Sequence, residues 1–427
     1  MKLLAGHPSR DVRIAIFKSP IEDLSLSPKA KLRTATQLVA DRYISQTGKF
    51  ISADLGAVKE PIRAILIKPV SDHCNLRCTY CYEGSDKSRF KTKRISTAIL
   101  EKTIRLAFEN CGAEIEFIWH GGEPLLAGKN IFIKGLDFQR KLKPKTVKIY
   151  NSIQTNGLML DDTWLNFLKE NGFSIGVSLD APQDIHDNYR IDSNGVGTFE
   201  RVSKSIQRLK EYGIPFGVIT VIHRQHIGRA REYLQAIEFL GINSIDIHPN
   251  LGNGESDSDL SAIEFSDFAI ELFEEWLSLK KSDIRINLFD DFIRGYFFTA
   301  PETCYFSGTC GSILAVEANG DLVPCTRPFD RTLHTFGNLT NNLILGSQLG
   351  PNLSRFREWD QYAQDTTAVK CKWHHLCHNG CPQHRVDANG NQDVRGANKY
   401  CACVSGEIGG YYSIWEHISN KFTELFL

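Results

Sequence analysis

The sequence has no net charge and no membrane-length apolar run, and its first residues lack the pattern of a signal peptide; each absence argues against a class of protein. Fifty basic and fifty acidic residues cancel in a chain of 427 residues, without a basic stripe or an acidic tail. Nucleic acid and charged membrane surfaces are therefore not expected as partners. No apolar run approaches the roughly 20 residues that span a bilayer, and the first residues soon turn charged instead of forming a signal-peptide core. We therefore expect a cytoplasmic protein.

Cysteine, by contrast, is abundant, and its twelve residues are unevenly spread. Disulfides are rare in the reducing cytoplasm, so these cysteines need another explanation. Cys111 stands alone, and we expect it to be a buried, inert thiol. The others fall into two groups, at residues 74–81 and at residues 304–403. Both groups indicate bound metal.

The first group is the C-x3-C-x2-C stretch of Cys74, Cys78 and Cys81. A four-iron cluster usually takes four cysteines, one for each iron. Three cysteines leave one iron open, and an open coordination position distinguishes a catalytic metal site from a structural one. Zinc fingers instead match one C-x2-4-C pair with a second pair, which a single triplet fits poorly. The triplet therefore predicts a catalytic iron–sulfur cluster.

Strands and helices are expected to alternate from residue 62 onward. Short runs rich in β-branched residues predict strands at residues 62–67, 115–119, 147–150, 174–179, 216–221 and 244–247. Helical segments are expected between them at residues 97–110, 162–171, 198–212 and 228–240. This alternation implies an α/β fold with a parallel sheet and crossover helices. Six units suggest an open or partial barrel, whose chemistry lies at the carboxyl ends of the strands.

Polar residues follow most of these strands, where such a barrel places its chemistry. After the second strand, Gly121 and Gly122 let a ligand approach the backbone closely. The Glu123 carboxylate that follows would accept a hydrogen bond from an ammonium group; the alternative is a solvated loop glutamate. Asn156 ends the third strand, and the polar ends of two further strands complete the pattern. The cysteine triplet follows the first strand, so it lies at the same edge.

These motifs resemble the radical SAM superfamily. Its cluster motif matches the cysteine triplet with Tyr80 before the last cysteine, and its Gly-Gly-Glu-Pro motif matches residues 121–124. The resemblance implies a partial (β/α)6 barrel. It also implies S-adenosylmethionine on the open iron of a [4Fe-4S] cluster, and a 5′-deoxyadenosyl radical that removes hydrogen from a substrate carbon.

The resemblance also implies which residues hold S-adenosylmethionine. By motif position, the methionyl ammonium would be held by Gly121, Gly122 and Glu123. The ribose or carboxylate would contact Ser178 and Arg190, since an arginine fork binds a carboxylate through two parallel bonds. Arg190 has a surface arginine as its alternative interpretation. The remaining candidates are Tyr80, near the adenine, together with Asn156 and His248.

The C-terminal cysteines resemble the SPASM extension of this superfamily, which holds two auxiliary [4Fe-4S] clusters in relatives. One cluster would be held by Cys304, Cys310, Cys325 and Cys381. The other would be held by Cys371, Cys377 and Cys401. Relatives usually carry a further cysteine where this chain has Ala368. Its place would be taken by Cys403 or by a histidine among His374, His375 and His378, or one iron would stay open.

Zinc bound by the same cysteines and histidines is the alternative for this region. The implied organisation is an N-terminal extension of unassigned role at residues 1–60, a radical SAM barrel at 61–255, a helical bridge at 256–303 and a SPASM domain at 304–427. Helices are expected within the last two parts at residues 260–279, 289–298 and 407–426.

SPASM relatives mostly modify peptides or proteins, so the resemblance implies a precursor peptide or protein substrate and a reductant such as flavodoxin or ferredoxin. Sulfatase-maturating relatives carry an aspartate, proposed as a base, directly after the cysteine that matches Cys325. Thr326 stands there instead, so no catalytic residue is assigned. We therefore predict a maturase that forms an intramolecular crosslink of the cyclophane carbon–carbon, ether or thioether type. The alternatives are a formylglycine-generating sulfatase maturase and, in another class, a non-catalytic iron–sulfur electron-transfer protein.

Overall fold

The computed structural model describes most of the chain beyond residue 60. The described residues are 61–83, 94–250, 260–279, 284–297, 301, 303–327, 329–340, 350–366, 371–389, 391–401 and 409–426. The extension at residues 1–60 lies outside them, and so do Ala368 and Cys403. In the part of the chain that is described, no helix combines the length and the apolar character needed to cross a membrane.

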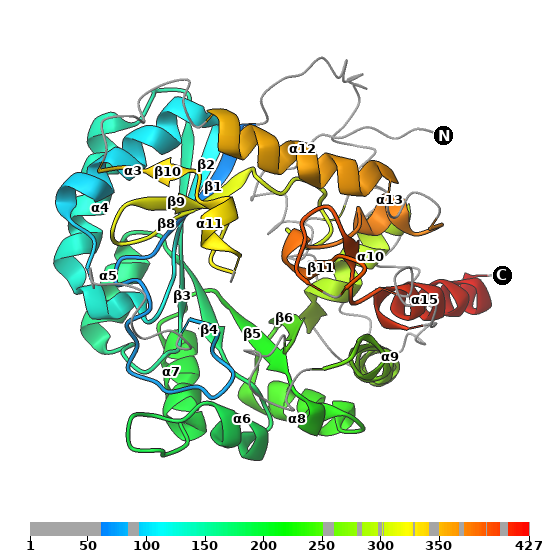
Figure 1. Cartoon of the computed structure of the whole chain (residues 1–427). Coiled ribbons are helices and arrows are strands. Elements are labelled where there is room, and N and C mark those ends of the chain that lie inside the picture. Colours follow the sequence, from blue (N-terminus) through cyan, green and yellow to red (C-terminus); the bar gives the residue numbers. More distant parts are fainter. Residues whose placement is uncertain are drawn as a thin grey trace.

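A single ten-stranded sheet organises the fold, in the order β10-β9-β8-β1-β2-β3-β4-β5-β6-β7 (Figure 1). The parallel strands from the barrel region are β1 (Ile62–Ile67), β2 (Cys111–Trp119), β3 (Lys148–Thr155), β4 (Ser174–Ser178), β5 (Phe216–Ile222), β6 (Ser244–Pro249) and β7 (Arg285–Ile286). The later strands are β8 (Ile313–Val316), β9 (Asp321–Val323) and β10 (Gly337–Asn338). All six expected strands are present and lie in chain order, so the predicted parallel α/β sheet is confirmed.

Helices surround the sheet in Figure 1. Those between the barrel strands are α3 (Thr97–Asn110), α4 (Lys129–Leu142), α5 (Asp162–Glu170), α6 (Gln183–Tyr189), α7 (Phe199–Glu211) and α8 (Ala230–Leu240). Side-chain caps fix two of their starts. The Ser96 hydroxyl accepts from the Ile99 amide at 3.2 Å, and the Asp161 carboxylate accepts from the Trp164 amide at 2.8 Å. Such caps satisfy amides that have no partner inside the helix.

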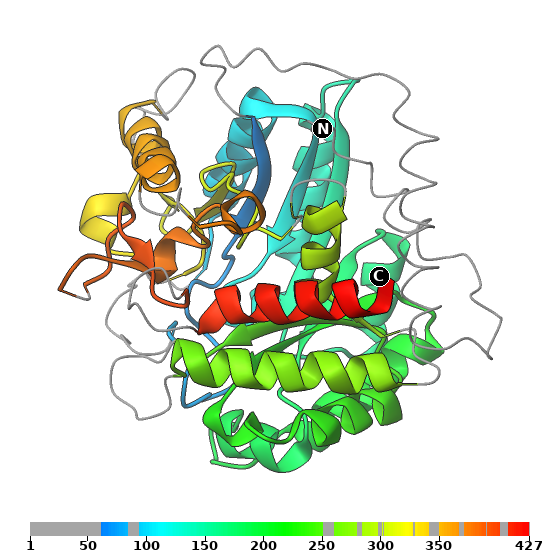
Figure 2. The same ribbon diagram turned by 90° about the vertical axis from the view of Figure 1, so that its right-hand side faces the viewer.

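The remaining helices belong to the C-terminal half. They are α9 (Ala262–Ser278), α10 (Asn287–Phe297), α11 (Arg331–His334), α12 (Gly350–Thr366), α13 (His374–Cys377) and α15 (Gly410–Phe426), with a small sheet of β11 (Arg385–Val386) and β12 (Ala397–Asn398). The helices α9 and α15 lie side by side, as Figure 2 shows. The expected helices near residues 260–279, 289–298 and 407–426 correspond to α9, α10 and α15.

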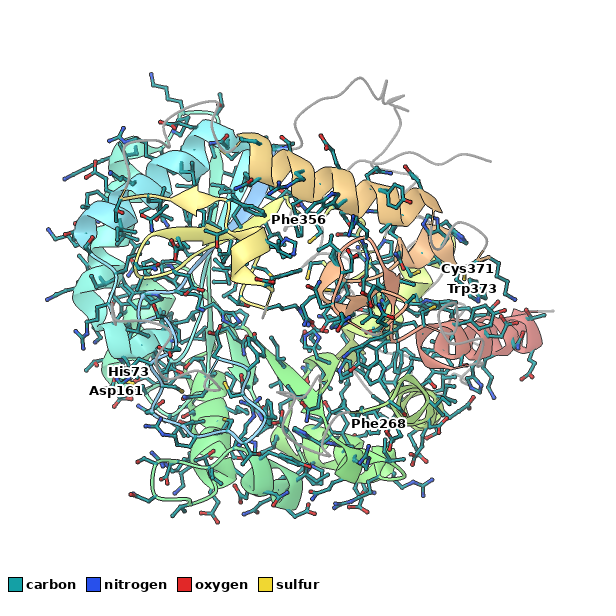
Figure 3. The ribbon with its side chains drawn as sticks, in the orientation of Figure 1. His73, Asp161, Phe268, Phe356, Cys371 and Trp373 are labelled. Carbon is teal, nitrogen blue, oxygen red and sulfur yellow. The ribbon has the colours of Figure 1, made fainter. Side chains whose placement is uncertain are left out.

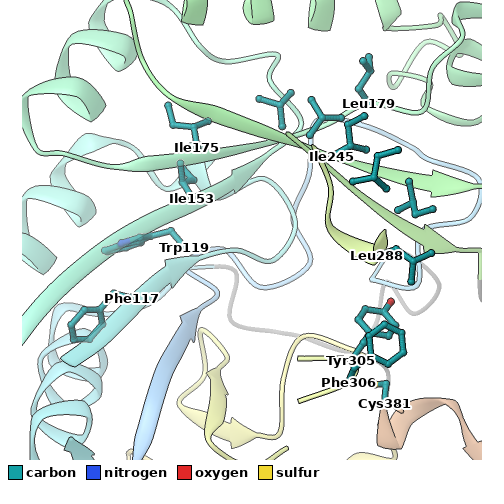
Figure 4. Close-up of a cluster of buried hydrophobic side chains, with 14 of the residues drawn as sticks. Phe117, Trp119, Ile153, Ile175, Leu179, Ile245, Leu288, Tyr305, Phe306 and Cys381 are labelled. Carbon is teal, nitrogen blue, oxygen red and sulfur yellow. The ribbon is translucent and has the colours of Figure 1, made fainter. Parts of the chain in front are cut away.

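The cysteine-rich region shares its sheet and its core with the barrel. Strand β8 pairs in parallel with β1, placing Ala64 opposite Ile313 and Ile67 opposite Val316. One cluster of buried apolar side chains reaches from Ile62 to Phe422. Figure 4 follows part of this cluster from Phe117 on β2 to Tyr305 and Cys381. The predicted domain boundary at residue 304 therefore does not separate two hydrophobic cores.

Cys111 departs from its expected environment. Its side chain is half-buried, because the residue lies at the first position of β2, and its sulfur is 3.7 Å from the carbonyl oxygen of Phe108. The expectation of a buried thiol is therefore wrong in its degree of burial.

Candidate active site

A cavity of about 260 Å³ lies at the carboxyl ends of the barrel strands. Its walls contain Cys74, Cys78 and Cys81, together with the predicted residues Tyr80, Gly121, Gly122, Asn156, Ser178, Arg190 and His248. On the opposite side, the cysteine-rich region contributes Tyr305, Thr326 and Arg327. The fold thus gathers the cysteine triplet and all but one of the predicted S-adenosylmethionine contacts around one space. Glu123 is the exception.

The loop that carries the cysteine triplet is held by the turn after β2. The Gly122 amide donates to the Ser71 carbonyl at 2.7 Å, and the Glu123 amide donates to the His73 carbonyl at 2.9 Å. A Cβ atom on Gly122 would lie 2.1 Å from the His73 carbonyl oxygen. Glycine is therefore required here, because the two backbones approach too closely for any side chain.

The three cysteines have an environment that suits metal ligation. The sulfur of Cys74 accepts from the Leu76 amide at 3.4 Å and from the Asn156 side-chain amide at 3.6 Å. Burial raises the pKa of Cys74 to about 11 and that of Cys78 to about 12. As isolated thiols they would therefore stay protonated at neutral pH, whereas a bound metal stabilises the thiolate form. The residues present thus fit an iron–sulfur cluster with three protein ligands.

Asp180 holds Arg190 and Tyr80, two residues that line the cavity. It is fully buried and accepts from Arg190 at 2.7 and 3.2 Å, from the Tyr80 hydroxyl at 2.8 Å and from the Val221 amide at 2.9 Å. Burial alone would raise its pKa, but Arg190 and His223 hold the pKa of this carboxyl well below its usual range. Asp180 is therefore an ionised anchor that fixes two predicted S-adenosylmethionine contacts.

Arg190 is accordingly no surface arginine, since only 7% of it is exposed. Two of its donors are engaged by Asp180, and the residue still lines the cavity. Its contact with S-adenosylmethionine stays a prediction. In the sequence, Asp180 is recognisable only as a polar residue at the end of a strand. The hydrogen-bond partners that define its role come from distant segments.

Glu123 is buried behind the cavity wall instead of lining it. Its carboxylate accepts from the Thr155 hydroxyl at 2.9 and 3.0 Å, from the Asn156 amide at 2.8 Å and from the Leu125 amide at 3.1 Å. Burial raises its pKa to about 7. The alternative of a solvated loop glutamate is wrong. The predicted contact with the methionyl ammonium stays a prediction, since the carboxylate here joins the ends of β2 and β3.

Comparison with known proteins agrees with this geometry. The Radical SAM superfamily model matches residues 69–240. A cysteine-type anaerobic sulfatase-maturating enzyme of Clostridium perfringens (strain 13 / Type A) is 30% identical over 351 residues, which cover 80% of this chain and 94% of that protein. A serine-type anaerobic sulfatase-maturating enzyme of Klebsiella pneumoniae is 30% identical over 83% of this chain and 87% of its own length.

This chain belongs to the radical SAM superfamily, in its SPASM subgroup. A solved structure described as native anSMEcpe with bound AdoMet and Kp18Cys peptide superposes with a TM-score of 0.72, at 27% identity, over 85% of this chain and 98% of that one. The expectation of a radical SAM enzyme that modifies a peptide or protein is thereby confirmed.

The four cysteines predicted to hold the first auxiliary cluster of this radical SAM enzyme lie near one another in the fold. Burial raises the pKa of Cys310 well above its usual value, and Asp360, Cys381, Cys325 and Cys304 raise it further. Such mutual effects require these thiols to lie close to one another. The four predicted ligands therefore share one neighbourhood beside the cavity.

The second auxiliary set forms a separate group. Burial raises the pKa of Cys377 to about 12, with further increases from Cys401 and Cys371. Figure 3 places Cys371 beside Trp373, on the side of the molecule away from His73 in the cysteine loop. The suggested replacement ligand Cys403 lies outside the described residues. That these two sets hold clusters stays a prediction.

The three histidines predicted as possible ligands differ in the exposure and hydrogen bonding of their rings. His378 donates from Nδ1 to the Phe306 carbonyl at 2.6 Å, His375 is exposed, and the buried Nε2 of His374 has no hydrogen-bond partner. Over the described residues, no three His, Cys, Asp or Glu side chains converge as ligands of a single metal ion. Zinc at these cysteines and histidines stays an untested alternative.

Proposed function

We propose that this radical SAM enzyme is an anaerobic maturase that oxidises a cysteine or serine side chain of a peptide or protein to formylglycine. The observation that carries the proposal is near-full-length similarity to both cysteine-type and serine-type sulfatase-maturating enzymes. Similarity to both types favours this reaction over the crosslinking predicted from the sequence.

The reaction requires a hydrogen atom, then a proton and an electron, to leave the substrate side chain. When bound, S-adenosylmethionine and the cluster at Cys74, Cys78 and Cys81 supply a 5′-deoxyadenosyl radical, which takes the hydrogen atom. Loss of one proton and one electron then converts a serine CH2–OH group to an aldehyde. A cysteine gives a thioaldehyde, which water converts to the aldehyde with release of hydrogen sulfide.

The residues of this chain divide these tasks. Cys74, Cys78 and Cys81 would hold the radical SAM cluster, and Asp180 would fix Arg190 and Tyr80 against S-adenosylmethionine. Cys304, Cys310, Cys325 and Cys381 would hold a cluster that accepts the electron.

The proton needs an acceptor other than Thr326. Two imidazoles line the cavity. His120 accepts from the Gly121 amide, and burial lowers its pKa to about 4, so it is a weak base. His248 lies 3.3 Å through Nε2 from Asp246 and stacks on Tyr305, with ring centres 4.9 Å apart. His248 lines the cavity and its ring is positioned by Asp246 and Tyr305, so His248 is the proposed base.

Crosslinking remains a second candidate, because Thr326 removes the aspartate that sulfatase-maturating relatives carry after the matching cysteine. The substrate radical would then add to a neighbouring side chain, and the adduct would lose one electron to the auxiliary cluster and one proton to leave the crosslink. The crosslinked residues would lie within one precursor peptide.

Anaerobic turnover with dithionite, S-adenosylmethionine and cysteine- or serine-containing sulfatase peptides separates these functions. We expect 5′-deoxyadenosine together with a peptide aldehyde that a hydrazine reagent traps. A peptide that loses hydrogen but forms no hydrazone would replace the proposal with crosslinking. Absence of 5′-deoxyadenosine from protein with intact clusters would refute both reactions.

A further inference from the structure

The cavity wall contributed by the cysteine-rich region holds a fixed positive charge at Arg327. Its Nη1 atom lies 3.1 Å from Nε2 of His384, and Nη2 donates to the Tyr305 hydroxyl. The guanidinium carbon lies 4.4 Å from the centre of the Tyr305 ring. Arg327 lines the cavity and faces the same space as the cysteine triplet. Stacking and hydrogen bonding thus hold the guanidinium in place before any substrate binds.

Among the described residues, Arg327 differs from Arg190, which also lines the cavity, and from the buried Lys68 in having no carboxylate within ion-pair distance. Arg190 is bound by Asp180, and the buried Lys68 lies 2.8 Å from Glu83 and 2.9 Å from Glu317. Within the described ranges, no Asp or Glu oxygen lies within the 4.0 Å ion-pair distance of Arg327. Its two contacts, a tyrosine hydroxyl and a histidine ring, carry no negative charge at neutral pH.

We propose that Arg327 binds a carboxylate of the peptide substrate, so that the enzyme selects peptides with an acidic group near the residue it modifies. A guanidinium away from bulk water is stabilised by an opposite charge, and its planar fork pairs with carboxylates through two bonds. Arginine has five N–H donors, and the two contacts to His384 and Tyr305 leave others for a ligand. Because the fork is already held, binding costs little side-chain entropy.

This inference rests on the proposed function only in requiring a peptide substrate. The carboxylate has two sources, an Asp or Glu side chain and the free carboxyl terminus of the peptide. Two other anions compete for the same arginine. One is the carboxylate of S-adenosylmethionine, and the other is the negative charge of a cluster at the nearby Cys304, Cys325 and Cys381, which interact with Arg327 electrostatically.

Peptide binding to the anaerobically reconstituted enzyme tests the proposal without depending on which bond is formed. Fluorescent peptides with one cysteine and an amidated terminus would carry Glu at each flanking position in turn, and matched peptides would carry Gln. A third series would have a free carboxyl terminus and no acidic side chain. Dissociation constants are measured in the presence of S-adenosylmethionine for the wild type, Arg327→Met, Arg327→Lys and, as a control, Arg201→Met, an exposed arginine on α7.

We expect the wild type to bind a Glu peptide or a free-terminus peptide about tenfold more tightly than its neutral match, which corresponds to about 1.4 kcal/mol. Arg327→Met should abolish this preference, Arg327→Lys should keep part of it, and Arg201→Met should keep it fully. The position or series that shows the preference identifies the source of the carboxylate.

Several outcomes would overturn the proposal. One is a wild type that shows no preference, and another is an Arg327→Met variant that retains it. A third is a variant that changes only the dissociation constant for S-adenosylmethionine or the reduction potential of an auxiliary cluster, with peptide preference intact. A negative aldehyde assay would refute formylglycine formation but would leave these binding results valid.

Discussion

At the scale of single residues, the buried ion pair of Asp180 and Arg190 joins stability to function. Both side chains are buried, and the carboxylate also accepts from Tyr80 and Val221. Removing one partner of such a pair leaves an uncompensated charge that water cannot reach.

Asp180→Asn keeps the shape of the side chain and should lower the free energy of unfolding by about 3 kcal/mol, because Arg190 loses its counter-charge. It should also weaken binding of S-adenosylmethionine, since Tyr80 and Arg190 lose their anchor. Urea denaturation and calorimetric titration measure the two effects. Asp184→Asn, in an exposed pair with Arg229, should change stability much less. Equal losses in the two variants would contradict the anchoring role.

Glu123 gives the protein a pH-dependent stability. Its pKa is about 7 in the folded state, above the ordinary value of 4.5, so the folded protein holds a proton that the unfolded chain has released. The contribution of Glu123 to the free energy of unfolding should therefore be greatest below pH 4.5 and fall as pH rises through 7. The full loss is about 3 kcal/mol.

Denaturation curves at a series of pH values check this slope. The Glu123→Gln variant removes the titrating group and should show a flatter dependence across the same range. Identical slopes for the variant and the wild type would mean that Glu123 is ionised throughout.

At the scale of elements, the turn after β2 and the cysteine loop form one unit through the backbone contacts of Gly122. A Cβ atom there would overlap the His73 carbonyl, which is backbone and cannot move aside as a flexible side chain can. The loop position is therefore coupled to the turn.

Gly122→Ala should displace the cysteine loop, lower the iron content by up to about four irons per chain, and reduce formation of 5′-deoxyadenosine by at least roughly tenfold, given the sensitivity of reacting centres to small misplacements. Iron analysis and anaerobic turnover measure these changes. Gly112→Ala, at the start of β2, would meet only Pro61 at 3.5 Å and should retain both. A fully active Gly122→Ala enzyme would contradict the coupling.

Elements with strong local patterns were predictable, whereas those made by distant partners were not. The range predicted for α3 agrees with the structure, where Ser96 caps its first turn. The helix α4 was missed because it begins after Gly128 without a side-chain cap. Strand β8 has four residues, and its neighbour β1 lies about 250 positions earlier, so no local pattern marks it.

The candidate site shows the same division. A characteristic spacing in the sequence marks Cys74, Cys78, Cys81 and the glycines after β2. No such spacing marks Arg327, because its place in the cavity depends on how β9 meets the barrel. The sequence therefore indicated the wall that carries the cysteine triplet, and it gave no sign of Tyr305 and Arg327 in the other wall.

At the scale of the whole molecule, ten of the described cysteines form three groups, of three, four and three residues, and for each group we predict a four-iron cluster. Anaerobically reconstituted protein should contain roughly 12 irons per chain. The Cys74→Ala, Cys78→Ala, Cys81→Ala triple variant should lose about four of them. Iron analysis measures both values, with Cys111→Ala as a control that keeps the full content. A triple variant with wild-type iron would refute the assignment of the first group.

Because β1 pairs with β8, this part of the sheet can form only after residues far apart in the chain have both been synthesised. Lys68 and Glu317 are separated by 249 positions, which a ribosome takes roughly 10 to 50 seconds to cover at 5–20 residues per second. During that interval the edge of β1 beside the cysteine loop has no β8 strand along it. Residues 313–316 add this strand only after the first six barrel strands have emerged. The sheet beside the cysteine loop is therefore completed only late in synthesis, when β8 joins β1.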